Sequence, residues 1–357
     1  MEDQYRQFKF RVNEACSIKE KEAFPLMVCD TILLSHSDVL DLFTMANCVR
    51  SQEEVFKAHR NNKAWNGKSG GIFPNNKIMN HPLFARIICG GIEPDWFGIK
   101  MAALGEGSSK ERPRMYLLSL FKSIDLYPRA IIEGEHISNA RTGAVSAVAT
   151  KYLARKDAKI IGILGAGAVA RQSLLAHHCI EWPVKKVLVY CRSPQLRNEF
   201  ASTMETQTGY VIEPRSDAKS VVKEAEILIT ATNSYEPIFE SKWVQPGTHL
   251  NAMGQALEID PHLLLRSIII VDDMHEATTV GKTSKGIQEG FITEESVCST
   301  LGDLLTEKKF VRSNDNDITV FDSSGLCMQD IACGIELLQL AQKRGIGDIT
   351  TKLAYSN

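Results

Sequence analysis

The chain has 357 residues, 44% of them hydrophobic, and a formal net charge of −2. This length allows two domains with ordinary cores, and the absence of a basic block argues against nucleic acid as the main partner. No apolar run approaches the roughly 18 residues of a membrane span, and the first residues are charged. We therefore expect a soluble, cytoplasmic protein without a membrane partner.

The nine cysteines are scattered along the chain and form no Cys-x-x-Cys pair. This pattern favours reduced thiols over a disulfide framework or a zinc site. His177 and His178 are adjacent, so on a helix their side chains diverge. We expect no metal site.

The first third of the chain begins with a segment rich in Lys, Glu, Gln and Arg at 1–24, which predicts a short helix or a loose arm. A strand is expected at 31–34, followed by a helix capped at 37–38 and a second helix at about 51–59. Residues 61–82 are rich in Asn, Gly and Pro, which indicates a loop region.

The segment that follows alternates apolar strands and turns, which indicates an antiparallel or mixed sheet. Ser138 is expected to cap a helix that contains Arg141 and ends at Leu153, and the small residues of this helix permit close packing. The pattern thus predicts a mixed α+β domain over residues 25–138. Its expected strands are 84–88, 96–101, 114–121 and 128–132.

The stretch 159–176 has the pattern of a buried strand, a glycine turn and a helix. The first glycine permits the tight turn, the second lets a pyrophosphate approach the backbone, and the first helical N–H groups face the anion. A second strand at 187–190 follows at βαβ spacing. The pattern predicts a dinucleotide site; the alternative is a merely structural glycine turn. The residues expected at the pyrophosphate are Gly165, Gly167, Ala168 and Val169.

The end of the second strand bears on which dinucleotide binds. An NAD site usually places Asp or Glu there, whereas this chain has Cys191, Arg192 and Ser193, with Arg197 one turn further. Arg192 can pair with a 2′-phosphate and stack on adenine. We therefore expect NADP(H), with NAD(H) possible; the alternative is that Arg192 is an ordinary solvated arginine.

Five further apolar runs predict a Rossmann-type, doubly wound parallel sheet over residues 139–327. Ligands of such sheets lie outside the carboxyl ends of the strands. The amphipathic helix 328–343, which Gly345 terminates, is assigned with residues 328–357 to the first domain. The runs are 210–212, 227–230, 249–251, 268–271 and 318–321. The residues expected at the cofactor are Thr232, Asn233, Asn251, Met253 and Ser323.

Six segments, in this order, resemble the ornithine cyclodeaminase/μ-crystallin family, and the likeness runs from about residue 32 to residue 347. The resemblance implies a two-domain protein that forms a homodimer through its substrate domain at 25–138 and binds NAD(P)(H) on its Rossmann domain. It also implies a small amino-acid or imino-acid substrate and chemistry at the Cα–N bond. The segments are NARTGAVSAVATKYLA, GILGAGAVA, ILITATNS, PGTHLNAMG, IIIVDD and ITVFDSSGLCMQDIACGIELLQLA.

The resemblance also implies roles for single residues. Lys100 matches the family's lysine that contacts the substrate carboxylate and imine, and Arg141 matches the arginine of its arginine-threonine motif. Thr142 would then lie by the cofactor phosphates. The family's early substrate arginine has no clean match, and Lys77 and Arg86 are both candidates.

Lys100 and Arg141 suit the reduction of an imine by a hydride. The substrate carboxylate must be held in place, and a proton must be available for the substrate nitrogen. Lys100 and Arg141 can supply the clamp, with Arg86 or Lys77 assisting, and Lys100 can be the general acid or base. The alternatives are an exposed strand lysine and an Arg141 that pairs with Glu133 or Glu135.

One loop departs from part of the family. Cyclodeaminases carry an aspartate and then Pro-Gly-Lys after the glycine that corresponds to Gly254, whereas this chain continues with a shorter loop through Glu258. The departure argues against cyclodeamination. The short loop and residues 84–114 most resemble the N-(2-amino-2-carboxyethyl)-L-glutamate dehydrogenase subgroup.

These observations predict an oxidoreductase that reduces an imine or oxidatively splits an N-carboxyalkyl amino acid. Two alternatives stay open. The first is a non-catalytic NADPH-binding protein like the crystallin members. The second is an ornithine or lysine cyclodeaminase.

Overall fold

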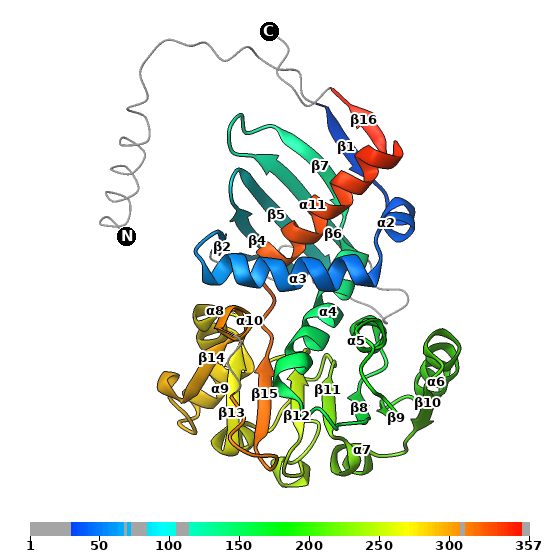
Figure 1. Ribbon diagram of the computed structural model, residues 1–357, viewed down its shortest axis with the longest axis vertical. Coiled ribbons are helices and arrows are strands. Elements are labelled where there is room, and N and C mark those ends of the chain that lie inside the picture. The colour runs from blue at the N-terminus through cyan, green and yellow to red at the C-terminus, as the bar shows by residue number, and fades with distance from the viewer. Residues whose placement is uncertain (1–29, 68–69, 73–83, 105–113, 308–310, 352–357) are drawn as a thin grey trace, which may run out of the picture.

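A computed structural model describes residues 30–67, 70–72, 84–104, 114–307 and 311–351 (Figure 1). It has two sheets: sheet A contains β1 to β7 and β16, and sheet B contains β8 to β15. The fold is α/β, with a doubly wound sheet and a second, mixed sheet, as predicted. The predicted arm at 1–24 and Lys77 lie outside the described residues. Within the described part of the chain, no helix is long and apolar enough to cross a membrane.

Sheet A is mixed: β4 to β7 form an antiparallel meander, and β1 joins β7 in parallel. The prediction of a loop at 61–82 was wrong in part, because β2 (Ala64–Asn66) and β3 (Gly70–Ile72) pair with β4. Such short strands are held by backbone hydrogen bonds, which composition does not reveal. The other strands are β1 (Thr31–Leu34), β4 (Phe84–Ile92), β5 (Trp96–Leu104), β6 (Arg114–Lys122), β7 (Pro128–Glu133) and β16 (Asp348–Thr350).

The two helices after β1 begin earlier than predicted. Helix α2 (His36–Leu42) follows Ser35, whose side chain and that of Asp38 form a capping box, so the cap precedes the predicted Ser37. Helix α3 (Met45–Arg60) begins after Thr44, which accepts a hydrogen bond from the Asn47 N–H, and not near residue 51.

Helix α11 (Cys327–Arg344) crosses the inner face of sheet A, which carries Lys100 and Leu118 (Figure 1). The helix and sheet approach closely at two glycines. A Cβ on Gly98 would lie 2.8 Å from Ile331, and one on Gly334 would lie 2.7 Å from Leu118. The predicted end of this helix is confirmed, because Gly345 adopts a left-handed conformation there.

The outer face of sheet A carries large apolar side chains that are exposed among the described residues. Side chains alternate between the two faces of a strand, so the residues next to those of the inner face point outward. Four large apolar side chains there are 36% to 57% exposed: Leu33, Ile87, Ile99 and Met115.

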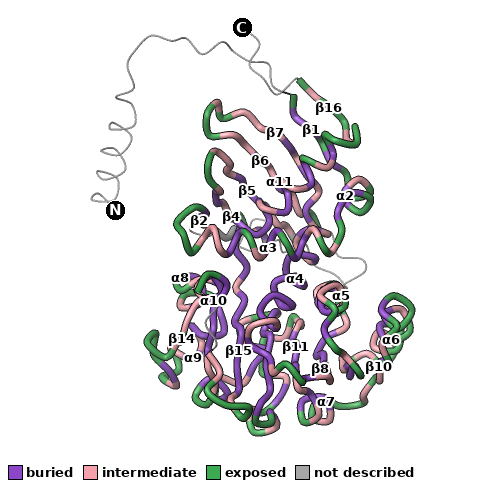
Figure 2. The backbone as a smooth tube through the Cα atoms, in the orientation of Figure 1, coloured by how far each residue is buried: buried purple, intermediate pink, exposed green. Residues whose placement is uncertain are grey.

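Helix α4 (Glu135–Leu153) leads from sheet A to sheet B and is almost wholly buried (Figure 2). Gly134 is its N-cap, so Ser138 lies inside the helix and does not cap it as predicted. A Cβ on Gly143 would lie 2.6 Å from the Gln172 carbonyl oxygen of α5 (Ala168–Cys179). The predicted close packing of this helix is therefore confirmed.

Sheet B is parallel throughout, in the order β10-β9-β8-β11-β12-β15-β13-β14. The order reverses between β8 and β11, which is where doubly wound sheets bind nucleotides. Edge strand β14 (Val297–Thr300) was not predicted, because it has no apolar run. The others are β8 (Ile160–Leu164), β9 (Lys186–Tyr190), β10 (Val211–Pro214), β11 (Ile227–Thr230), β12 (His249–Ala252), β13 (Ser267–Val271) and β15 (Ile318–Asp322). The accompanying helices are α6 (Pro194–Thr208), α7 (Ala218–Glu224), α8 (Met274–Thr279), α9 (Lys282–Gln288) and α10 (Leu301–Glu307).

Candidate active site

The turn after β8 has the form of an anion cradle. Gly165 has a φ of +113°, and a Cβ there would overlap the Ala231 carbonyl oxygen, so only glycine fits. Gly167 is the exposed N-cap of α5, makes no side-chain capping bond, and a Cβ there would have no atom within 4 Å. Its neighbours Ala168 and Val169 begin the helix. Uncapped N–H groups beside open space suit a pyrophosphate.

Three polar side chains follow β9, and two of them are engaged within the protein. Ser193 caps α6 by accepting a hydrogen bond from the Leu196 N–H. Arg197 donates to the Cys191 carbonyl at 3.2 Å. Arg192 is exposed and has no hydrogen-bond or ion-pair partner among the described residues. Arg192 is thus the cation available to a ligand at this strand end.

The loops after β11 and β12 are tied together by a buried carboxylate. Glu258 accepts hydrogen bonds from Thr230, from both the N–H and the hydroxyl of Thr232, and from the Gly254 N–H. Its two oxygens are therefore committed to holding the loop. Asn233 of the same loop is exposed.

Three residues expected at the cofactor have buried side chains. Asn251 is buried and donates to the Thr150 hydroxyl at 2.9 Å. The Ser323 hydroxyl faces Asp272 at 3.5 Å. Met253 is also largely buried. The Asn251 side chain therefore points toward α4, and the place of Asn251 at the cofactor stays a prediction.

The structure brings Lys100 and Arg141 together, although 41 positions separate them in the chain. Lys100 Nζ lies 2.6 Å from Asp330 Oδ1, and Arg141 Nε lies 3.5 Å from Asp330 Oδ2. Lys100 also donates to the Ser138 hydroxyl at 2.8 Å. Neither alternative for these cations holds: Lys100 is only 4% exposed, and the carboxylate beside Arg141 is Asp330, not Glu133 or Glu135.

The electrostatics of this trio favour an anionic ligand. Two cations and one carboxylate leave one net positive charge in a buried site while Lys100 is protonated, and a substrate carboxylate would balance it. Burial lowers the pKa of Lys100; Asp330 opposes this shift and Arg141 adds to it. A lysine with a lowered pKa can exchange a proton near neutral pH more readily than an exposed one.

Two further residues of α4 and the loop before α11 surround Arg141. Thr142 donates to the Ser138 carbonyl and is largely buried. A Cβ on Gly325 would lie 3.1 Å from the Arg141 guanidinium, so the loop passes directly over it. Arg141 is therefore placed between sheet A and the carboxyl ends of sheet B.

Arg86 lies on the same face of sheet A as Lys100. It pairs with Ala102 across β4 and β5, so Lys100 is its diagonal neighbour, at about 7–8 Å between backbones. Arg86 is 3.6 Å from Glu276 of α8, across the cleft between the sheets. Burial raises the pKa of Glu276, and Arg86 opposes that shift.

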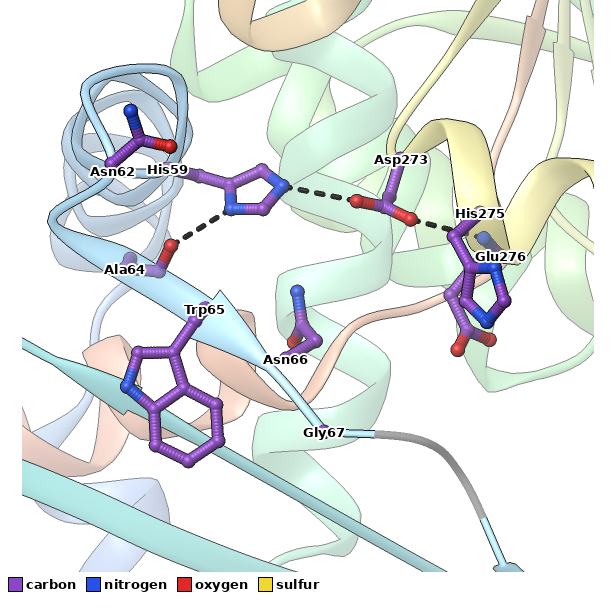
Figure 3. Close-up of a pocket in the computed structure, with 9 residues that line it drawn as sticks. All are labelled: His59, Asn62, Ala64, Trp65, Asn66, Gly67, Asp273, His275 and Glu276. Carbon is purple, nitrogen blue, oxygen red and sulfur yellow. Dashed lines mark hydrogen bonds and ion pairs between the residues drawn. The ribbon is translucent and has the colours of Figure 1, made fainter. Parts of the chain in front are cut away.

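A pocket of about 530 Å³ opens beside this pair, between α3, β2 and α8 (Figure 3). His59 reaches across it: Nδ1 lies 2.9 Å from the Ala64 carbonyl and Nε2 lies 3.1 Å from Asp273. The hydrogen bond to Asp273 raises the pKa of His59. The volume of the pocket is in the range of small-molecule sites. Glu276 lines this pocket and forms the ion pair with Arg86, which lies on the same sheet face as Lys100.

Sequence reasoning did not single out Asp330, Ser138 as a partner of Lys100, His59 or Glu276. Asp330 offered one signal, since it is the only carboxylate in the first turn of an apolar helix. A buried carboxylate in such a helix calls for a cationic partner. Which cation, however, depends on how α11 crosses sheet A.

Comparisons with known proteins agree with this geometry. A sequence model of the ornithine cyclodeaminase/mu-crystallin family matches residues 96–338. A Delta(1)-pyrroline-2-carboxylate reductase of Bacillus cereus is 33% identical over 288 residues, which cover 78% of this chain and 87% of that protein.

Two solved structures share nearly the whole fold. The Delta(1)-pyrroline-2-carboxylate reductase of Thermococcus litoralis, in complex with NADH and L-proline, superposes with a TM-score of 0.83 at 31% identity. The superposition covers 89% of this chain and 99% of the reductase chain. An archaeal alanine dehydrogenase dimer with bound NAD superposes with a TM-score of 0.81 at 27% identity, over 90% of this chain and 99% of that chain.

Proposed function

Because the chain belongs to the ornithine cyclodeaminase/mu-crystallin family, we propose that it is an NAD(P)(H)-dependent oxidoreductase acting on the C–N bond of an amino acid or its imine. Relatives with these descriptions reduce an imino acid or oxidise an amino acid. One observation carries the proposal: Lys100 and Arg141 meet at Asp330, and the loop that follows β15 of sheet B passes over Arg141. The substrate is proposed to be a ketimine or an N-carboxyalkyl amino acid.

The chain's own residues have distinct parts in this reaction. Arg141 donates hydrogen bonds to the substrate carboxylate, the Lys100 ammonium adds its positive charge to this clamp, and Arg86 is an assisting cation on the same face as Lys100. An ammonium has three N–H donors, and Asp330 and Ser138 take two. The third is directed to the substrate, where Lys100 gives or takes the proton of the substrate nitrogen. When bound, the coenzyme supplies or accepts the hydride.

The test is a spectrophotometric screen of NADPH and NADH oxidation with a matrix of oxo acids and amines, read also in reverse with secondary amino acids. A coenzyme loss that requires both an oxo acid and an amine supports the proposal. Coenzyme binding without any turnover would instead indicate a crystallin-like binding protein. Ammonia release from ornithine or lysine without net coenzyme change would indicate a cyclodeaminase, which the commitment of Glu258 to its loop argues against.

We propose NADP(H) as the preferred coenzyme, on the ground that Arg192 is the unengaged cation at the end of β9. We expect Arg192→Ala to raise the KM for NADPH by about 10- to 100-fold, because a hydrogen-bonded charge pair contributes about 1.5–3 kcal/mol. The KM for NADH should change less than about threefold. Steady-state kinetics with both coenzymes measure the two values.

Arg197→Ala is the matched control, because Arg197 is already bonded to the Cys191 carbonyl. We expect a smaller and equal loss for both coenzymes. If the wild-type protein favours NADH, or if Arg192→Ala weakens both coenzymes alike, the assignment of Arg192 to a 2′-phosphate is wrong.

A second copy of the chain is proposed to cover the outer face of sheet A, where apolar side chains are exposed. An archaeal relative is described as a dimer. We expect Ile99→Asp to convert the protein from dimer to monomer in sedimentation velocity at micromolar concentration, because a buried carboxylate without a partner opposes association. Val211→Asp, on edge strand β10, adds the same charge at an exposed strand position and should leave the sedimentation coefficient unchanged. A wild-type monomer would contradict the proposal.

A further inference from the structure

The carboxylate at the centre of the cation pair is the least exposed member of the site. Asp330 is 1% exposed, comes from the first turn of α11, and faces one cation from β5 and one from α4. Side chains from β5 and α4 therefore meet the two carboxylate oxygens of Asp330, which α11 supplies. A surface salt bridge would contribute little, but a buried one fixes the groups that it joins.

We propose that Asp330 is the positioning residue of this site, holding the Lys100 ammonium and the Arg141 guanidinium side by side as the clamp for the substrate carboxylate. This inference rests on the proposed function and deepens it. Asp330 does not touch the substrate in this arrangement, because Oδ1 faces Lys100 and Oδ2 faces Arg141. It acts through the two cations.

The hydrogen bonds of the trio are incomplete in a way that fits this role. Arg141 Nε and Asp330 Oδ2 are buried and make no hydrogen bond among the described residues, being 3.5 Å apart. Arg141 Nη1 is held by Gln329, which in turn donates to Gln52. The guanidinium is thus held on one side, and its remaining donors are available to an incoming anion.

Asp330 also sets the charge of the clamp. The charged and titratable groups around Lys100 on the packed elements are Arg86 of β4, Arg141 of α4, Tyr116 of β6, and Asp330 and Cys327 of α11. Asp330 supplies the negative charge that favours the Lys100 ammonium, against burial and Arg141. Without it, two buried cations would repel each other, and Lys100 would lose its proton at a lower pH.

The test is the pH profile of kcat/KM for imine reduction in Asp330→Asn, an isosteric variant without the charge. If Lys100 donates the proton, activity falls as pH rises through its pKa. We expect the alkaline limb of the profile to move down by at least about one pH unit, with a loss of about 10- to 50-fold at the wild-type optimum that is partly regained at lower pH. Asp330→Glu, which keeps the charge, should keep the limb within about half a unit.

Two controls separate this role from a structural one. Ser138→Ala removes the neutral partner of Lys100 and should lower activity with the limb unmoved. Coenzyme affinity, measured by titration calorimetry, should be unchanged in all three variants. A loss in Asp330→Asn that is equal at every pH, or a limb shift in Ser138→Ala of the same size, would overturn the inference.

The inference and the proposed function can fail separately. If wild-type protein shows no turnover, the proposed function fails, and the inference is then read from binding of an oxo acid such as pyruvate across pH. We expect Asp330→Asn to lose that binding at a lower pH than the wild type. Identical binding profiles in the two proteins would overturn it. Should Asp330→Asn not fold, Asp330→Ser takes its place, because it also removes the charge: its alkaline limb should move down, whereas the limbs of Asp330→Glu and Ser138→Ala should stay in place.

Discussion

Replacing Lys100 by methionine is expected to lower kcat/KM at least about 1,000-fold while leaving coenzyme affinity within about twofold, because one change removes both the proton donor and a cation of the carboxylate clamp. General acid catalysis alone contributes about 100- to 10,000-fold. Methionine has a similar length and fills the same space between β5 and α11. Single-turnover kinetics with the best imine from the screen would measure the rate, and calorimetry would measure the affinity.

Two matched variants show which property of Lys100 matters. Lys100→Arg keeps the charge but not a transferable proton, so we expect it to keep much of the substrate affinity and lose the rate. Lys122→Met removes another lysine of the same sheet. Its ammonium pairs with Asp95 at 2.7 Å and not with Asp330, so the rate should be unchanged. If Lys100→Met reduces an imine at more than about a tenth of the wild-type rate, Lys100 is not the acid.

Replacing Gly167 by aspartate is expected to abolish coenzyme binding, with a loss of affinity of at least about 100-fold and no change in melting temperature of the free protein. The backbone at Gly167 is extended, with φ of −83°, and a Cβ meets no atom within 4 Å, so the fold accepts a side chain. The space it would enter is that of the anion, and a like charge there is repelled. Thermal shift with and without NADPH gives both quantities.

Gly167→Asn separates size from charge, since it has the same shape as the aspartate variant, and we expect it to lose less affinity. Gly165→Ala gives the opposite pattern. Its φ of +113° and the overlap with the Ala231 carbonyl predict a lower melting temperature before any effect on binding. Normal coenzyme affinity in Gly167→Asp would show that the turn after β8 is not the pyrophosphate site.

The half of the chain that forms sheet B could be predicted from the sequence because its signals are local. Buried parallel strands appear as short apolar runs, and the positions of β8, β11 and β15 follow from them. β14 has no such run, so its place at the sheet edge depends on pairing with β13. The same holds for β2 and β3, where an Asn- and Gly-rich stretch forms strands because β4 offers it backbone partners.

The contacts of the candidate site could not be predicted, because they join residues that are far apart in the chain. The family resemblance pointed to Lys100 and Arg141, but it did not indicate what lies between them. Asp330 is 230 positions from Lys100 in the chain, and no local pattern records that α11 returns across sheet A to meet β5. Arg141 was expected at a helix start, whereas α4 begins at Glu135 and carries it one turn further.

Gly143 limits how the molecule can adapt to other substrates. Because the backbone of α4 meets the backbone of α5 there, the helix that joins the two sheets is held directly against a helix of sheet B. A wider cleft would require a different helix crossing, which no surface substitution supplies. A bulkier substrate would therefore need smaller side chains on α3, β2 and α8, which line the pocket. The distance from the turn after β8 to Lys100 and Arg141 would stay the same.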